Sequence, residues 1–273
     1  MRWYQNHDCT FNRKTLKKAM KKIYSVLLFL TVLMNTSEIF AQEYRYATYE
    51  QEGESLPYRI LLPENYDAKK NYPLLLFLHG SGERGNDNEL QLVHGSTLFL
   101  DSEFRKNNPA IIVFPQCAKE AYWATTNQTD TGFTYIKKPK NNPTLDLVEG
   151  MLDDVIQNYG VDKKRIYVGG LSMGGMGTFE LVYRNPRMFA AAFAICGGAN
   201  PKIARKIRRP VWRIDHGEAD QVVAVDLSKK MVDALLKKRA SVVYNWYAGV
   251  NHNSWDAVFA DPEFLPWLFA QKK

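Results

Sequence analysis

Cysteine is scarce in this sequence: it holds three in 273 residues, and only Cys117 and Cys196 lie beyond residue 41. A disulfide between these two would suit an exported protein, but sequence alone does not fix a pairing. Three motifs are absent: His-Glu-x-x-His, Gly-x-x-x-x-Gly-Lys and Gly-x-Gly-x-x-Gly. Their absence removes the usual signals for a zinc peptidase, a phosphate-binding loop and a dinucleotide-binding domain.

A marked excess of charge is also absent once the first 41 residues are set aside. The formal net charge is +7, but residues 1–41 hold seven Lys or Arg and two Asp or Glu. The remainder holds 29 of the 36 bases and 27 of the 29 acids, a net of +2. This balance argues against nucleic-acid binding, which needs a concentrated basic surface. The densest basic cluster, within residues 202–209, is better explained as a solvated face.

No apolar run is long enough for a transmembrane helix, which needs about 20 residues. The run over residues 23–34 follows Lys21 and Lys22 and leads to Ala41, which is the pattern of a secretory signal peptide. A membrane anchor or a buried strand is the alternative. We therefore expect translation to begin at Met20, residues 1–41 to form a leader, and the product to be secreted or periplasmic without stable membrane insertion.

Short apolar runs alternate with helical patterns over the rest of the chain. Residues 72–78 and 111–114 are continuous apolar runs, as in strands buried on both faces. Residues 145–159 and 226–239 carry apolar stripes at helical spacing. This alternation predicts an α/β fold with a mostly parallel central sheet. Further strands are expected at 44–49, 56–62, 166–168, 190–195, 211–214 and 241–247, and helices at 174–184 and from residue 255 onward.

Two connections bear on access to a site. The 14 residues 197–210 between two expected strands leave no room for a cap domain. Residues 115–144 form a long connection, and connections of this length are usually functional or disordered. Its aromatic side chains argue against disorder and predict one wall of the site; they are Tyr122, Trp123, Phe133 and Tyr135.

A Gly-x-Ser-x-Gly motif centred on Ser172 lies between an expected strand and an expected helix. That context is typical of a nucleophile elbow, a tight turn that presents the serine hydroxyl. Gly170 and Gly174 would leave room for the turn, and the helix N-terminus would favour developing negative charge. We predict that Ser172 is a nucleophile; a plain strand-to-helix turn is the alternative.

A serine hydroxyl needs an adjacent base, and elbow topology gives the chain order serine, acid, histidine. His216 and His252 both follow Ser172, and His252 comes after the last expected strand, where a loop can reach back. Asp220, in the loop after residues 211–214, would accept the other ring N–H of His252 and fix its tautomer. The rival acids are Asp215, Glu218 and Asp226.

An oxyanion hole needs two preorganised N–H donors. The backbone of Met173, directly after the nucleophile, should supply one. The glycine-rich loop after residues 72–78 should supply the other, from Ser81 or alternatively Gly82. His79 is expected to pack this loop rather than act as a second base.

These segments together resemble the single-domain α/β-hydrolase carboxylesterases related to polyhydroxybutyrate-depolymerase-like and feruloyl-esterase-like enzymes, a group also labelled predicted peptidases. The resemblance covers roughly residues 56–271. It rests on residues 78–85 (LHGSGERG), 170–175 (GLSMGG), 216–223 (HGEADQVV), 252–256 (HNSWD) and 261–268 (DPEFLPWL).

The resemblance implies an α/β-hydrolase fold with helices on both faces of the sheet, no cap domain and a catalytic domain over residues 42–273. It implies two strands between residues 111–114 and 190–195, and hence free thiols at Cys117 and Cys196. It also implies that Trp123 and Trp255 line the acyl or alcohol pocket, with ordinary packing as the alternative.

The sequence thus predicts a secreted serine carboxylesterase that needs no cofactor and uses Ser172, Asp220 and His252. The expected substrates are small-molecule or polysaccharide esters, with acyl or feruloyl groups on polysaccharides as the narrower hypothesis. A prolyl-oligopeptidase-like serine peptidase is the first alternative. The second is a non-catalytic binding protein that kept the fold.

Overall fold

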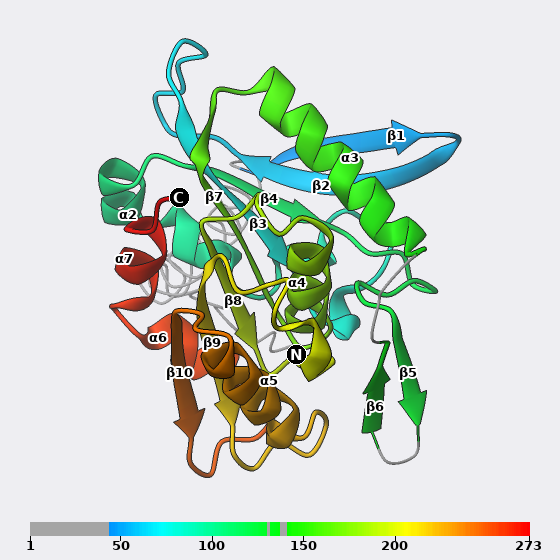
Figure 1. Ribbon diagram of the computed structural model, residues 1–273. Coiled ribbons are helices and arrows are strands. Elements are labelled where there is room, and N and C mark those ends of the chain that lie inside the picture. The colour runs from blue at the N-terminus through cyan, green and yellow to red at the C-terminus, as the bar shows by residue number, and fades with distance from the viewer. Residues whose placement is uncertain (1–43, 130–131, 137–140) are drawn as a thin grey trace, which may run out of the picture. The chain divides into compact units, whose positions relative to one another are not determined.

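The computed structural model describes residues 44–129, 132–136 and 141–273. The predicted leader, residues 1–41 with a start at Met20, lies outside the described residues. An eight-stranded sheet runs in the order β1-β2-β4-β3-β7-β8-β9-β10 (Figure 1). Its strands are β1 Arg45–Gln51, β2 Glu54–Leu61, β3 Tyr72–Leu78, β4 Ile111–Pro115, β7 Val161–Leu171, β8 Ala191–Ile195, β9 Val211–Gly217 and β10 Val242–Tyr247.

The sheet is mostly parallel, as predicted. Every neighbouring pair from β4 through β10 is parallel, while β2 pairs antiparallel with both β1 and β4. Strands β3 and β7 lie between β4 and β8. Cys117 and Cys196 follow β4 and β8, and both are buried free thiols, which confirms that expectation.

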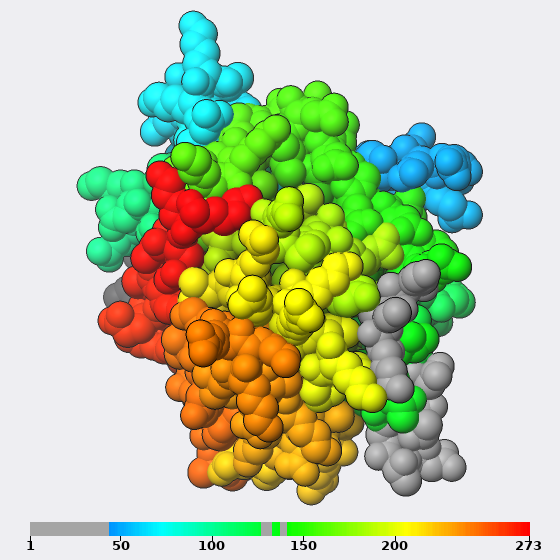
Figure 2. All heavy atoms as spheres, viewed as in Figure 1, coloured from blue at the N-terminus to red at the C-terminus, as the bar shows by residue number. Residues whose placement is uncertain are grey.

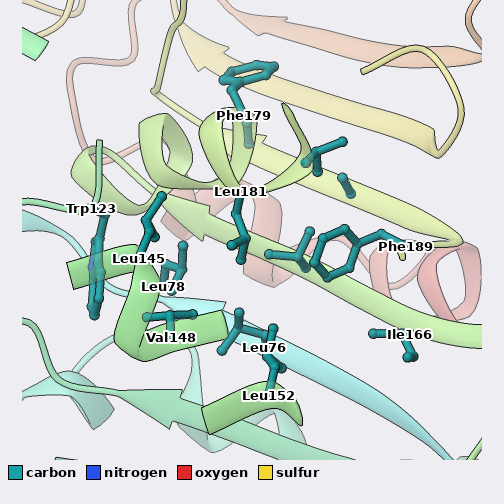
Figure 3. Packing of buried hydrophobic residues seen from close by; sticks show 14 of the residues in the cluster. Leu76, Leu78, Trp123, Leu145, Val148, Leu152, Ile166, Phe179, Leu181 and Phe189 are labelled. Carbon is teal, nitrogen blue, oxygen red and sulfur yellow. The ribbon is translucent and has the colours of Figure 1, made fainter. Parts of the chain in front are cut away.

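Helices cover both faces of the sheet because β3 is apolar on both of its sides. Its Leu76 and Leu78 join the core beneath α3 (Pro143–Asn158), α4 (Met173–Arg184) and α5 (Val225–Lys237). Figure 3 shows this core with Leu145, Val148 and Leu152 of α3 beside Phe179 and Leu181 of α4. Burial of each such side chain contributes about 1.5–3 kcal/mol.

The opposite face is covered by three short helices, α2 (Ser102–Asn107), α6 (Trp255–Ala260) and α7 (Phe264–Phe269). Helix α7 lies beside α2 (Figures 1 and 2), where the rings of Phe104 and Phe269 meet edge to face with centroids 5.2 Å apart. Phe77 and Phe114 stack on the sheet beneath them, 4.8 Å apart. Within the described residues no helix is long and apolar enough to cross a membrane.

Three elements differ from the sequence-based expectation. The connection 115–144 contains a two-stranded hairpin, β5 (Thr126–Thr129) and β6 (Gly132–Tyr135). Strand β7 begins at Val161, five residues before the predicted start, because Val161 pairs with Tyr72 of β3. The expected C-terminal helix is divided into α6 and α7, with Pro262 between them. The connection 197–210 holds only a short 3-10 turn, Pro201–Ile203, among its described elements.

Candidate active site

Ser172 occupies the turn between β7 and α4 in a conformation that few side chains tolerate. Its φ is 52° and its ψ is −117°, a strained combination for a residue with a Cβ. The turn is held by its N–H, which donates to the carbonyl of Ile195 at 2.8 Å. A Cβ at Gly170 or Gly174 would collide with the carbonyl oxygen of Leu78. These glycines therefore allow the strand, turn and helix to close tightly around the hydroxyl.

The structure brings Ser172, His252 and Asp220 into one hydrogen-bonded chain. Ser172 Oγ lies 2.9 Å from His252 Nε2, and His252 Nδ1 lies 2.7 Å from Asp220 Oδ2. The Asp220 side chain is fully buried, whereas that of His252 is 19% exposed. The three residues follow β7, β9 and β10, so the carboxyl ends of three parallel strands assemble the group.

The loops that carry Asp220 and His252 are fixed to each other by the backbone. Gly217, at the end of β9, has no room for a Cβ because the carbonyl oxygens of Val250 and Asn251 lie against it. The side chain of Asn251 accepts the N–H of His252 at 2.8 Å and that of Gln221 at 3.0 Å. The acid and the histidine are therefore positioned as one unit.

Asp220 is held as a carboxylate by the groups around it. Burial raises the pKa of Asp220, but hydrogen bonds from His216, His252 and two backbone N–H groups outweigh burial, and the pKa falls below its usual range. The two backbone donors are Val222 and Val223, which reach Oδ1 at 2.8 and 2.9 Å. This carboxylate can stabilise a proton on His252.

The rival acids are engaged elsewhere. Asp215 is fully buried and pairs with Arg213, with 2.9 Å between Oδ2 and Nε. Glu218 pairs with Lys229 at 3.2 Å on the surface. Asp226 lies in the first turn of α5. None of these three makes a described hydrogen bond to His252.

The two predicted oxyanion donors lie at the starts of the two turns next to Ser172. Met173 is the first residue of α4, and Ser81 is the first residue of a 3-10 turn after β3. Neither N–H donates to another group among the described residues. The loop passes close to the nucleophile, since a Cβ on Gly80 would lie 3.8 Å from Ser172 Cβ. Two free N–H groups at these positions suit a developing oxyanion.

His79 packs the loop that follows β3, as predicted. Its Nε2 accepts the N–H of Cys117 at 3.0 Å, so Nδ1 carries the proton and donates to the carbonyl of Gly80 at 2.6 Å. The carbonyl of His79 accepts the indole N–H of Trp123 at 3.1 Å. Burial lowers the pKa of His79 to about 4, so the ring is neutral at pH 7.

The stability of the protein should therefore fall in acid partly through His79. A folded-state pKa of about 4 lies below the usual 6.5, so this contribution is complete above pH 6.5 and is lost toward pH 4. Between pH 7 and pH 4.5 the loss should be about 2.5 kcal/mol. Urea unfolding of wild type and His79→Gln across this range should give a correspondingly shallower pH dependence for the variant; parallel curves would contradict the assignment.

The prediction that Trp123 lines the pocket is wrong. Its side chain is fully buried, and Figure 3 shows it in the core beside Leu78 and Leu145. The Cβ of Trp123 packs against Gly177 of α4, where a side chain on the glycine would collide with it. An indole N–H can be buried only with a partner, which the carbonyl of His79 supplies. Trp123 thus supports the loop that follows β3 through the carbonyl of His79.

Trp255 does lie next to the candidate site. Its partly buried ring meets that of His252 edge to face, with centroids 5.5 Å apart, and its other neighbour is His94 at 5.1 Å. A second apolar cluster contains Met176, which lies one turn into α4, together with Val223 and Leu227. Aromatic side chains of the connection 115–144 pack against this cluster. The connection contributes Tyr122, Phe133 and Tyr135 to this wall.

Sequence reasoning missed Glu180, which anchors the aromatic connection. This carboxylate on α4 is 4% exposed and accepts both the N–H and the hydroxyl of Thr125, at 2.6 and 2.7 Å. It also accepts the amide of Asn142 at 3.3 Å. One side chain thus holds a residue before β5 and a residue after β6. The available signal was an acid on the buried face of an otherwise apolar helix.

One group of side chains has the spacing of metal ligands: ligand atoms of Cys196, Asp220 and His252 lie within 4.8 Å of one another. Both ring nitrogens of His252 and the Oδ2 atom of Asp220 are already engaged in hydrogen bonds. Burial also raises the pKa of the Cys196 thiol, which opposes the thiolate that a metal needs. The group therefore fits a proton relay to Ser172 better than a metal site.

Residues 50–257 match the family model described as "Putative esterase". The chain is 30% identical over 189 residues to the bifunctional acetylxylan esterase/xylanase of Neocallimastix patriciarum, covering 68% of this chain and 24% of that protein. It is 26% identical over 173 residues to feruloyl esterase C of Emericella nidulans, covering 59% of this chain and 57% of that protein. The chain thus spans only part of the length of these relatives.

Solved structures agree with the fold. A thermostable esterase superposes with a TM-score of 0.79 at 31% identity, covering 86% of this chain and 64% of that chain. A ferulic acid esterase from Anaeromyces mucronatus, solved with ferulic acid, superposes with a TM-score of 0.64 at 20% identity, covering 84% and 90%. The second likeness concerns the fold alone. Because the family match extends from the last two residues of β1 into α6, and so includes β2 and the six strands that follow it in the sheet, the chain belongs to this esterase family and has its α/β-hydrolase fold.

Proposed function

We propose that this protein is a serine carboxylesterase in which Ser172 is the nucleophile, His252 the general base and Asp220 the acid that orients it. The observation that carries the proposal is the continuous chain from Ser172 Oγ through His252 to Asp220, at 2.9 and 2.7 Å, built on a strained elbow. A serine activated in this way attacks acyl carbonyls.

The reaction follows from the positions of these atoms. His252 Nε2 takes the proton from Ser172 as Oγ bonds to the ester carbonyl carbon, and the N–H groups of Met173 and Ser81 receive the oxyanion. Collapse breaks the bond to the alcohol, which leaves with the proton from His252. Water then repeats the sequence on the acyl-enzyme, releases the acid and restores Ser172.

For the substrate we propose acyl or feruloyl esters of polysaccharides. The similarity of the chain to an acetylxylan esterase and a feruloyl esterase supports this class. Trp255 and the aromatic wall of Tyr122, Phe133 and Tyr135 offer apolar surface for an acyl group near the hydroxyl. The leader pattern of residues 1–41 supports export, where such polymers are met.

Labelling with a fluorophosphonate, followed by mass spectrometry, tests the nucleophile. Wild-type protein should carry one adduct on Ser172, and Ser172→Ala should carry none. Ser102→Ala, which alters an exposed serine at the start of α2, is the matched control and should label like wild type. A folded wild-type protein that takes no adduct would overturn the proposed triad.

A substrate panel tests the class of ester. Acetylated and feruloylated xylans should be hydrolysed, along with a small aryl ester, while a proline-containing peptide should not. If the aryl ester were cleaved and neither xylan were hydrolysed, the esterase proposal would stand and the polysaccharide hypothesis would be wrong. Preferential cleavage of the peptide would favour a serine peptidase instead.

A further inference from the structure

His216 is a second histidine on the carboxylate of Asp220, and the proposed reaction does not use it. It lies near the end of β9 and is fully buried. Its Nε2 lies 3.0 Å from Asp220 Oδ2 and 2.8 Å from the carbonyl oxygen of Val223. Its Nδ1 lies 2.7 Å from Ser228 Oγ on α5. Every polar atom around the ring therefore belongs to a defined contact.

Counting donors and acceptors in these contacts indicates the protonation state of the His216 ring. Nε2 faces a carboxylate oxygen and a carbonyl oxygen, which only accept, so Nε2 carries a proton. Nδ1 faces the hydroxyl of Ser228, which also lies 2.8 Å from the carbonyl oxygen of Gly197. Because that carbonyl oxygen can only accept, we assign the single hydroxyl proton to it. Ser228 Oγ must then accept from Nδ1, so Nδ1 carries a proton as well. A histidine with both nitrogens protonated is an imidazolium.

We propose that His216 is a buried imidazolium that positions Asp220 and balances its charge from the side opposite His252. It is a positioning residue, since it acts on the reaction through Asp220, and the inference rests on the proposed triad. A buried carboxylate needs a paired charge, and His216 supplies one beneath the site.

The groups packed around His216 offer no competing charge among its described contacts. Strand β8 leads to the Gly197 carbonyl and the Cys196 thiol, and burial raises the pKa of that thiol, so it stays neutral. Strand β10 places Trp246 in register with His216, and α5 presents Ser228. The loop after β9 presents Asp220, with His252 on the far side of the carboxylate. One anion is thus shared by two histidines.

Sharing Asp220 between two histidines should affect how the activity depends on pH. With His216 charged, a proton arriving on His252 meets a carboxylate that is already neutralised, so protonation of free His252 is disfavoured. Loss of the His216 charge should return the full attraction of Asp220 to a proton on His252, and the acid limb of the activity profile should move to higher pH.

Two variants separate the charge from the hydrogen bond. His216→Gln keeps an amide donor for Asp220 but removes the charge, and His216→Leu removes both. For His216→Gln the acid limb of kcat/KM should move upward by about one pH unit, a loss of about tenfold on that limb relative to its own plateau. A purely structural role would lower the stability of both variants, more so with Leu, and leave the acid limb of His216→Gln where it is in wild type.

A measurement on wild-type protein keeps the proposal testable if these variants do not fold. With histidine labelled with ¹⁵N, the His216 ring should show two attached protons at pH 7.5, and the other four histidines provide the comparison. A single ring proton on His216, or an unmoved acid limb in folded His216→Gln, would overturn the proposal. Failure of the triad itself would appear separately, as absent fluorophosphonate labelling.

Discussion

Replacing Ser172 with alanine should lower kcat for an ester by about 10⁵–10⁶-fold, as for other serine hydrolases whose nucleophile is removed. The variant loses the only hydroxyl that His252 Nε2 contacts in the described structure, at 2.9 Å. The site should otherwise remain, because alanine is smaller than serine and the proposed oxyanion donors, the N–H groups of Met173 and Ser81, belong to the backbone. Steady-state hydrolysis of an aryl ester, with circular dichroism to verify folding, measures the effect.

The same assay on Ser102→Ala supplies the matched control, and its kcat should equal that of wild type. Residual turnover in Ser172→Ala should stay above the rate in water, because the oxyanion donors and the binding surface still act. If Ser172→Ala kept more than about one hundredth of wild-type kcat, water or another side chain would have to be the nucleophile. The elbow would then be only a strained turn.

The parts of the fold that sequence could predict are those with strong local signals. Strands β3 and β4 are continuous apolar runs, and both were located to within one residue because burial on both faces leaves no polar position. The elbow at Ser172 was located for a different reason: close packing against Leu78 demands glycine at fixed offsets. Fold topology then supplied the order of the other two residues.

The parts that sequence could not predict depend on distant partners. The paired strands β5 and β6 have the sequences TNQT and GFTY, which carry no strong strand pattern, and residues before and after them are held by Glu180 of α4. The early part of β7 is the polar segment DKKR, extended because Val161 pairs with Tyr72. Aromatic character marked Trp123 as pocket surface, yet a tryptophan with a partnered N–H packs equally well inside.

The position of Asp220 in the sequence was enough to choose it over its rivals, but the sequence did not predict which groups surround its carboxylate. Sequence shows that His216 precedes Asp220 by four residues, and it does not show that both reach the same oxygen. That contact depends on the course of the chain after Gly217, which is bent by close backbone contact with the loop of His252. The contact of both histidines with one carboxylate oxygen is therefore visible only in the tertiary structure and not in the sequence motif.

Replacing Asp220 with asparagine should lower kcat by about 10⁴-fold, and the reason lies in which oxygen is replaced. Oδ1 accepts the N–H groups of Val222 and Val223, so the single carbonyl oxygen of asparagine is held at that position. The amide NH₂ then falls at the position of Oδ2, where it faces His252 Nδ1 and His216 Nε2. The N–H groups of His252 and His216 would then both point at an NH₂ group, which is itself a donor, and neither could form its hydrogen bond.

His252 can relieve this conflict only if its Nδ1 accepts a hydrogen bond from the amide, and the single ring proton of His252 then lies on Nε2. In that tautomer Nε2 donates toward Ser172 Oγ and cannot take its proton, so the base is lost while the fold remains. Glu218→Gln, an exposed acid in the same loop, is the matched control and should keep wild-type kcat. A loss of less than about tenfold in folded Asp220→Asn would mean that another group fixes the tautomer of His252. His216 must also give up its Nε2 proton or its contact in this variant, so ¹⁵N signals from both histidines should change together.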